Sequence, residues 1–308
     1  MNRDIVRDNM ATPIKITNVT KYYARSKVPA VYDLSLSIQT GEVYGLIGSN
    51  GAGKSTTIRM ILDFIRPSSG TIQLFCKDTS QSGVTLRDRV GYLPGDVVLP
   101  KGVTGQEFLT YLGSLSNETD PAYAEKLAKR FEAQLDKKMN QLSKGNRQKI
   151  GIVQAFMHQP DVLILDEPTS GLDPLMQEQF YHTVDEARQR GATILLSSHS
   201  FEEVERMCDR IGIMRQGKFV HEGATTDVIA TQKPRWRVTC KHAEGIAKLK
   251  DSPALTVIDL GQTSVTVEPT NSIEKALEAL SHTTIVSMTT SQHGLEDEFL
   301  RFYEEPQS

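Results

Sequence analysis

Two hydropathy patterns alternate along the first 230 residues of the chain. Short apolar runs of strand length are separated by longer stretches with helical periodicity, which is the pattern of an α/β protein. The run at residues 162–165 is apolar throughout, which predicts a central parallel strand covered on both faces. The predicted strands are residues 14–19, 33–38, 43–47, 162–165, 193–196 and 211–214.

Two segments depart from this pattern. Residues 33–38 place Leu34, Leu36 and Ile38 at every second position, which predicts a half-buried strand in an antiparallel sheet. Between residues 104 and 158 only helical periodicity is present. We therefore expect a helical subdomain, at about residues 96–158, inserted into the α/β core.

A second domain is predicted after a break at residues 231–234. Its order of strand, helix, two strands, helix and strand is that of a small α+β ferredoxin-like sandwich. We therefore divide the chain into a first domain, 13–230, and a C-terminal accessory domain, 233–308. The predicted elements of the second domain are residues 236–240, 243–249, 255–260, 264–267, 272–280 and 284–288, with a last helix at 295–303.

Composition and charge exclude several function classes. The chain has 308 residues and a net charge of −3, which disfavours binding nucleic acid through bulk positive charge. No run approaches the roughly 18 apolar residues of a membrane span, and the first residues lack the apolar segment of a secretory signal. The 3 cysteines are far apart in the sequence, which argues against a zinc site or a disulfide framework. We expect a cytoplasmic protein, with Met1 or Met10 as its native start.

A phosphate-binding loop is the strongest chemical signal. Residues 48–55, GSNGAGKS, match G-x4-G-K-[ST] between a predicted strand and a predicted helix. Such a loop turns backbone N–H groups toward phosphates at a helix N-terminus. We expect Lys54 to reach the β- and γ-phosphates and Ser55 to ligate Mg²⁺. The alternative, a chance match in a glycine-containing turn, does not account for the flanking elements.

Two acids, Asp166 and Glu167, follow the apolar run at 162–165. They are therefore expected at the C-terminal end of a buried strand, where open α/β sheets bind ligands. Asp166 would hold Mg²⁺ through water, and Glu167 would act as the general base on the attacking water. A solvated strand end gives the same pattern, but the phosphate-binding loop about 110 residues upstream favours the catalytic interpretation.

Three further segments are candidate parts of the site because of their positions in the sequence. LSKGNRQ at residues 142–148 places Ser143 and Gly145 at the start of a predicted helix, which alone is typical of an ordinary helix cap. SGLD at residues 170–173 follows Glu167. His199 follows the strand at 193–196, so we expect its ring to face a γ-phosphate.

Together these segments resemble the nucleotide-binding subunit of an ATP-binding-cassette (ABC) transporter over about residues 13–230. The resemblance implies an ATPase core with an antiparallel β subdomain and an inserted helical subdomain. It also implies that a head-to-tail dimer sandwiches ATP and Mg²⁺. In this arrangement Ser55 and Asp166 bind the metal. The implied catalytic residues are Glu167, His199 and Lys54. The implied phosphate-loop contacts are Gly48, Ser49, Asn50, Gly51, Ala52, Gly53, Lys54, Ser55 and Thr56.

The resemblance assigns four more residues. Tyr23 resembles the aromatic residue that stacks on adenine, with Tyr22 as the alternative. Ser143 and Gly145 match the signature motif, which in this family faces the γ-phosphate held by the opposite subunit. Asp173 matches the acid of the D-loop at the dimer seam.

The sequence departs from the family pattern at two motifs. The usual signature LSGGQ reads LSKGN here, with Lys144 in place of glycine and Asn146 in place of glutamine. At the Q-loop, Gly95 stands where glutamine or glutamate is usual, which removes a side-chain ligand to Mg²⁺ and water. Asp96 or solvent then fills that position.

The C-terminal segment LEDEFLRFYE resembles the accessory domain of ABC-2 type drug and antibiotic exporter ATPases. This implies a multi-spanning membrane permease as partner, at the inner face of the cell membrane, with a homodimeric or heterodimeric ATPase pair. The two alternatives are a soluble ABC ATPase acting on ribosomes or DNA, and a regulatory module that binds ATP without turnover. The single cassette opposes the first, and the presence of Asp166, Glu167 and His199 opposes the second.

Overall fold

The structure is a computed structural model that describes residues 12–24, 26–98, 100–115, 119–230, 234–261 and 263–291. The chain divides into two compact units, Met1–Thr225 and Thr226–Ser308, and each is described by itself. Among the described residues, no helix has the length and hydropathy needed to cross a bilayer.

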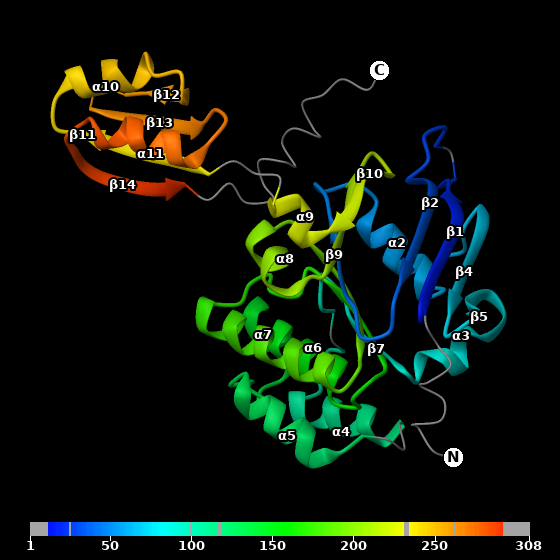
Figure 1. Cartoon of the computed structure of the whole chain (residues 1–308). Helices are drawn as coiled ribbons and strands as arrows, with labels where there is room; N and C mark the ends of the chain where they lie inside the picture. Colours follow the sequence, from blue (N-terminus) through cyan, green and yellow to red (C-terminus); the bar gives the residue numbers. More distant parts are fainter. Residues whose placement is uncertain are drawn as a thin grey trace. The chain divides into compact units, whose positions relative to one another are not determined.

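A six-stranded sheet forms the centre of the first unit (Figure 1). Its strand order is β10-β9-β3-β8-β7-β6, and only β10 is antiparallel to its neighbour. Every residue of β3, β7 and β8 is buried, as expected for central parallel strands. The strands are β3 (Val43–Ile47), β6 (Val90–Leu93), β7 (Val162–Asp166), β8 (Thr193–Ser198), β9 (Arg210–Arg215) and β10 (Lys218–Ala224).

Each face of this sheet is covered by different elements. Tyr44 and Leu46 of β3 belong to a core shared with α2 and with a second, antiparallel sheet. Gly45, on the opposite face of β3, lies against Val204 of α8. The helices around the sheet are α2 (Lys54–Ile61), α3 (Thr79–Arg87), α7 (Pro174–Gln189) and α8 (Phe201–Met207), and α9 (Thr225–Ala230) follows β10.

The antiparallel sheet has the order β2-β1-β4-β5. Leu34, Leu36 and Ile38 of β2 are all buried, which confirms the predicted half-buried strand. The strands are β1 (Ile14–Lys21), β2 (Val31–Ile38), β4 (Ser69–Leu74) and β5 (Lys77–Asp78).

The region predicted to be helical contains α4, α5, a 3₁₀ turn and α6, which pack on one another (Figure 1). Its described residues form no strand, only an isolated bridge between Thr104 and Lys138. Helix α6 also contacts β6, so it joins this region to the six-stranded sheet. The elements are α4 (Gly105–Leu115), α5 (Pro121–Arg130), η1 (Met139–Gln141) and α6 (Lys144–Phe156).

The second unit follows the predicted order of strands and helices. Its antiparallel sheet has the order β12-β13-β11-β14, and both helices contribute to one core on the same sheet face. The predicted last helix at residues 295–303 lies outside the described residues. The elements are β11 (Arg235–Cys240), α10 (Ala243–Lys250), β12 (Leu255–Leu260), β13 (Ser264–Pro269), α11 (Ile273–Ser281) and β14 (Ile285–Ser291).

The contact between β6 and α6 generates a stability prediction. A Cβ at Gly91 would lie 2.1 Å from the carbonyl oxygen of Ala155, so Gly91→Ala forces the two elements apart. We expect this variant to lower the free energy of unfolding by about 1–3 kcal/mol, measured by urea denaturation. Gly113→Ala on α4 is the control, because its nearest neighbour is 3.4 Å away and alanine favours a helix. Equal stability of the two variants would contradict the packing described.

Candidate active site

The phosphate-binding loop connects β3 to α2. Gly53 ends this loop with φ +114°, a left-handed conformation that suits glycine, and no side chain caps the helix that follows. The helix N-terminus that follows the loop therefore suits an anionic ligand. The predicted contact residues Ser49, Asn50 and Gly51 are exposed at the tip of the loop, Gly48 and Ala52 are buried, and Ser55 and Thr56 are half-buried.

Lys54 is buried at the base of the loop. Its Nζ donates to the carbonyl oxygens of Gly48, at 2.6 Å, and Ser49, at 3.4 Å. Burial lowers the pKa of Lys54, and the charges of Glu167 and Asp166 oppose that shift. The charge of Lys54 is therefore influenced by both predicted acids, which lie at the end of β7 near the base of the loop.

The two acids stand at the end of β7. Asp166 is buried, and its Oδ1 accepts a hydrogen bond of 2.5 Å from the hydroxyl of Ser197 on β8. Glu167 follows in a left-handed conformation, φ +48°. Its N–H donates to the carbonyl oxygen of Ser197 at 3.0 Å and to the hydroxyl of Ser197 at 3.2 Å. Both acids are therefore held against β8.

His199 follows β8, and its Nδ1 lies 3.6 Å from Oε1 of Glu167. The start of α8 holds this turn, because the buried Glu203 carboxylate accepts a hydrogen bond from Ser198. Burial raises the pKa of Glu203. Lys54, Asp166, Glu167 and His199 thus gather at the C-terminal edge of neighbouring parallel strands, as predicted.

The signature segment lies against the D-loop of its own chain. Ser143 caps α6, because its hydroxyl accepts the N–H of Asn146 at 3.2 Å. A Cβ at Gly145 would lie 2.7 Å from the carbonyl oxygen of Gly171, so only glycine allows this approach. Lys144 Nζ donates to the hydroxyl of Ser170 at 3.2 Å.

Two other residues of this region serve the chain's own packing. Asn146 is buried, and its amide bonds the backbone of Gln134 through both Oδ1 and Nδ2. The amide that replaces the usual glutamine is therefore directed inward. Asp173 caps α7, because its Oδ1 accepts the N–H of Met176 at 3.0 Å.

Both candidate adenine-stacking residues adjoin the phosphate-binding loop. The hydroxyl of Tyr23 lies 3.4 Å from the hydroxyl of Thr56. Tyr22 lines a cavity of about 660 Å³ together with Gly51 of the loop and Tyr32. Because both rings are exposed beside the loop, the geometry leaves Tyr22 and Tyr23 as alternatives.

The Q-loop glycine lies directly beside Asp166. A Cβ at Gly95 would be 3.3 Å from the carbonyl oxygen and 3.5 Å from the carboxyl carbon of Asp166. Asp96, the predicted substitute for the missing side chain, is exposed. The space beside the Asp166 carboxylate therefore contains no side chain from position 95.

The donors in the site fit Mg²⁺. Asp166 and Ser55 offer hard oxygen atoms, and Mg²⁺ takes few protein ligands when substrate phosphates and water complete its octahedron. No group of three or more His, Cys, Asp or Glu residues that could hold a metal occurs among the described residues. A phosphate-bound Mg²⁺ needs no such group.

Sequence reasoning did not identify Ser197. Its signal was a hydroxyl near the end of an otherwise apolar strand, two residues before His199. Only the parallel register of β7 and β8, which pairs Asp166 with Ser197, shows that the hydroxyl lies beside the two acids.

The fold and the site define a nucleotide-binding P-loop ATPase of the α/β class. Residues 31–170 match the ABC transporter family. The chain is 35% identical over 228 residues to the ABC transporter ATP-binding protein NatA of Bacillus subtilis (strain 168), covering 71% of this chain and 93% of NatA. It is 34% identical over 218 residues to the bacitracin transport ATP-binding protein BcrA of Bacillus licheniformis, covering 69% of this chain and 70% of BcrA.

A solved structure agrees with these relatives. The ATP-binding subunit of an ABC transporter superposes with a TM-score of 0.66 at 31% identity, covering 71% of this chain and 93% of that subunit. The chain belongs to the family of ABC transporter ATP-binding proteins, and it is an ATPase.

The position of Gly95 generates a prediction about turnover. In Gly95→Gln the amide enters the space beside Asp166, and we expect kcat for ATP hydrolysis to rise about 2- to 10-fold, the equivalent of one net hydrogen bond. Gly95→Ala is the control, because it adds the Cβ contact without the amide. An unchanged kcat in Gly95→Gln would show that Asp96 or water already performs this role.

Proposed function

We propose that this chain hydrolyses ATP to power a separate membrane-spanning permease that exports drugs, antibiotics or other amphipathic compounds. The gathering of Lys54, Asp166, Glu167 and His199 at one edge of the sheet carries the ATPase part of the proposal. The similarity to BcrA, a protein named for bacitracin transport, supports the export part. The chain would act in the cytoplasm, at the inner face of the cell membrane.

The residues of the site have separable tasks in this reaction. The N–H groups of the loop and Lys54 bind the phosphates, with Lys54 Nζ exchanging the carbonyl oxygen of Gly48 for a phosphate oxygen. Glu167 accepts a proton from the attacking water, and His199 orients that water and the γ-phosphoryl group. Ser55 and Asp166 would hold Mg²⁺, which would supply positive charge to the phosphate oxygens. Tyr23 stacks on adenine, with Tyr22 as the alternative.

A head-to-tail dimer completes each site in this proposal. Ser143 and Gly145 belong to a helix N-terminus that contacts the D-loop of its own chain. In the dimer this N-terminus faces the γ-phosphate of the opposite subunit, and Asp173 lies at the seam. The pair is a homodimer, or a heterodimer with a second ATPase.

The two units have different roles in this proposal. Residues 13–230 form the ATPase domain, with the helical subdomain at about 96–158. Residues 233–308 form an accessory domain with a ferredoxin-like fold, which the order β12-β13-β11-β14 and the helices on one sheet face support.

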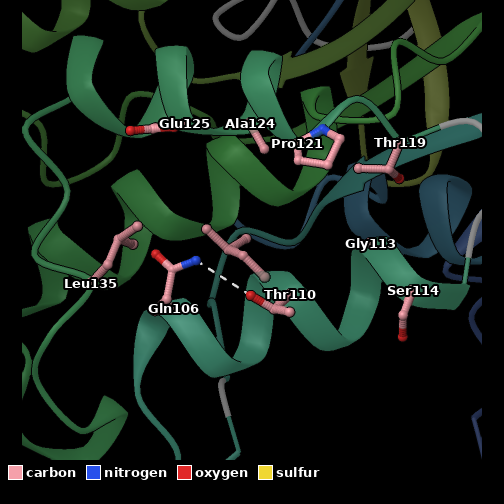
Figure 2. A pocket seen from close by; sticks show the side chains of 10 residues that line it. Gln106, Thr110, Gly113, Ser114, Thr119, Pro121, Ala124, Glu125 and Leu135 are labelled. Carbon is pink, nitrogen blue, oxygen red and sulfur yellow. Dashed lines mark hydrogen bonds between the residues drawn. The ribbon is translucent and has the colours of Figure 1, made fainter.

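A surface of the helical region supports docking of the permease. Val98 follows the Q-loop, and Tyr111 and Leu115 lie on α4; all three are exposed. A cavity of about 570 Å³ lies between α4 and α5, and Figure 2 shows Gln106 and Thr110 at its α4 side. Val97 and Leu109 are buried instead, so only part of this apolar segment is core. The exposed part would receive the coupling helix of the permease.

The general-base role of Glu167 is tested by Glu167→Gln. Because the amide cannot accept the proton of the attacking water, we expect turnover to fall at least about 100-fold while ATP binding is kept. The variant should then elute as a dimer in ATP during size-exclusion chromatography. Glu178→Gln is the control, because Glu178 on α7 forms an exposed ion pair with Arg206 on α8. A variant that binds ATP but stays monomeric would count against the sandwich.

Docking of the permease is tested by Tyr111→Glu. We expect the variant to retain the ATPase rate of the isolated protein within about 2-fold, because Tyr111 is exposed on α4 and substitutions at exposed positions usually have small effects. Recovery of a multi-spanning membrane protein with the tagged chain from detergent-solubilised cells should be lost. Ile258→Glu, an exposed apolar position of the second unit, is the control. Equal recovery with both variants would exclude this surface.

A further inference from the structure

One fully buried hydroxyl on β8 contacts both acids of the site. The hydroxyl of Ser197 donates to Oδ1 of Asp166 at 2.5 Å and accepts the N–H of Glu167 at 3.2 Å. The carbonyl oxygen of Ser197 accepts the same N–H at 3.0 Å. A serine hydroxyl has one donor and two acceptor sites, so these contacts are compatible with one another.

The contact with Asp166 fixes the orientation of a buried carboxylate. Such a group needs hydrogen bonds to offset the loss of water, and each one selects a direction for its oxygen atoms. On another side, the backbone of Gly95 approaches Asp166 without a side chain. Ser197 on β8 therefore supplies a side-chain hydrogen bond to this carboxylate, and position 95 of the Q-loop supplies no side chain.

The contact with Glu167 fixes the turn that follows β7. Glu167 adopts φ +48°, a conformation that is unfavourable for residues with a side chain and that persists where surrounding contacts hold it. The bonds from its N–H to both oxygen atoms of Ser197 are such contacts.

We propose that Ser197 is a positioning residue that orients Asp166 toward Mg²⁺ and holds the turn at Glu167. The inference rests on the proposed ATPase site. It adds that Ser197 aligns the metal ligand Asp166 in a chain that has Gly95 at the Q-loop position. Ser197 itself touches neither substrate nor metal. Loss of such supporting hydrogen bonds weakens metal binding or activity by about 10- to 100-fold in metalloproteins.

The experiment measures how much Mg²⁺ strengthens nucleotide binding. A fluorescent mant-labelled β,γ-imido analogue of ATP is titrated against the full chain in EDTA and again in Mg²⁺, and the ratio of the two Kd values gives the gain. The variants are Ser197→Ala, which removes the hydroxyl, and Ser197→Thr, which keeps it. Thr193→Val is the matched control, because Thr193 has a buried hydroxyl on the same strand that bonds Gly41 instead of the acids.

We expect Ser197→Ala to reduce the gain about 10-fold or to abolish it, with little change of Kd in EDTA. Ser197→Thr and Thr193→Val should keep the gain of the unmodified chain within about 2-fold. An unchanged gain in Ser197→Ala, or an equal loss of affinity with and without Mg²⁺, would overturn the proposal. If Ser197→Ala does not fold, as judged by thermal unfolding in EDTA, Ser197→Cys replaces the hydroxyl by a somewhat larger thiol that is a weaker donor, and it should show an intermediate gain.

Failure of the proposed function has a different signature in the same experiment. If the unmodified chain does not bind the analogue under either condition, the ATP site itself is wrong. If it binds the analogue with a gain from Mg²⁺ that Ser197→Ala retains, the ATP site stands and only the role of Ser197 is wrong.

Discussion

The parallel register of β3, β7 and β8 is the constraint on which the site depends. The C-terminal ends of parallel strands lie at the same edge of a sheet. This edge therefore brings together the loop after β3, the acids at the end of β7 and the histidine after β8. The register pairs Asp166 with Ser197 directly. A shift of one residue would turn the Asp166 side chain to the opposite face of the sheet and separate it from Lys54.

Helix α6 links this edge to the helical region. Its N-terminus approaches the D-loop so closely that Gly145 cannot carry a side chain, and further along Ala155 excludes a Cβ at Gly91 of β6. Between these points Gln148 donates to the carbonyl oxygen of Pro168 at 2.8 Å. The signature segment and the D-loop are therefore packed against each other in one chain, and we expect a displacement of one to affect the other. In the proposed dimer, contact of the signature with a nucleotide would thus also move the D-loop at the seam.

The sequence was sufficient wherever a local pattern determines structure. Apolar runs identified the central strands, alternation identified β2, and the glycine-rich motif identified a loop between a strand and a helix, β3 and α2. It was insufficient where a side chain's partner is distant in sequence. Asn146 turns inward because the backbone of Gln134 offers both a donor and an acceptor, and Ser197 serves Asp166 because two strands pair. Neither partner is marked by spacing or composition. The choice between Tyr22 and Tyr23 also stays open, since both rings adjoin the loop.

The charges at the strand ends constrain how a nucleotide can bind. Burial already disfavours the charged form of Lys54, and the nearby acids Asp166 and Glu167 favour it. A triphosphate that binds the loop places further negative charge beside Lys54, which attracts it. The same negative charge lies close to the two acids, which repel it. One lysine cannot neutralise both the phosphates and the carboxylates, so a divalent cation between Asp166 and the phosphates would remove the remaining repulsion. The cation can do this only if the Asp166 carboxylate is correctly directed. With glycine at position 95, that direction depends on the hydrogen bond from the neighbouring strand.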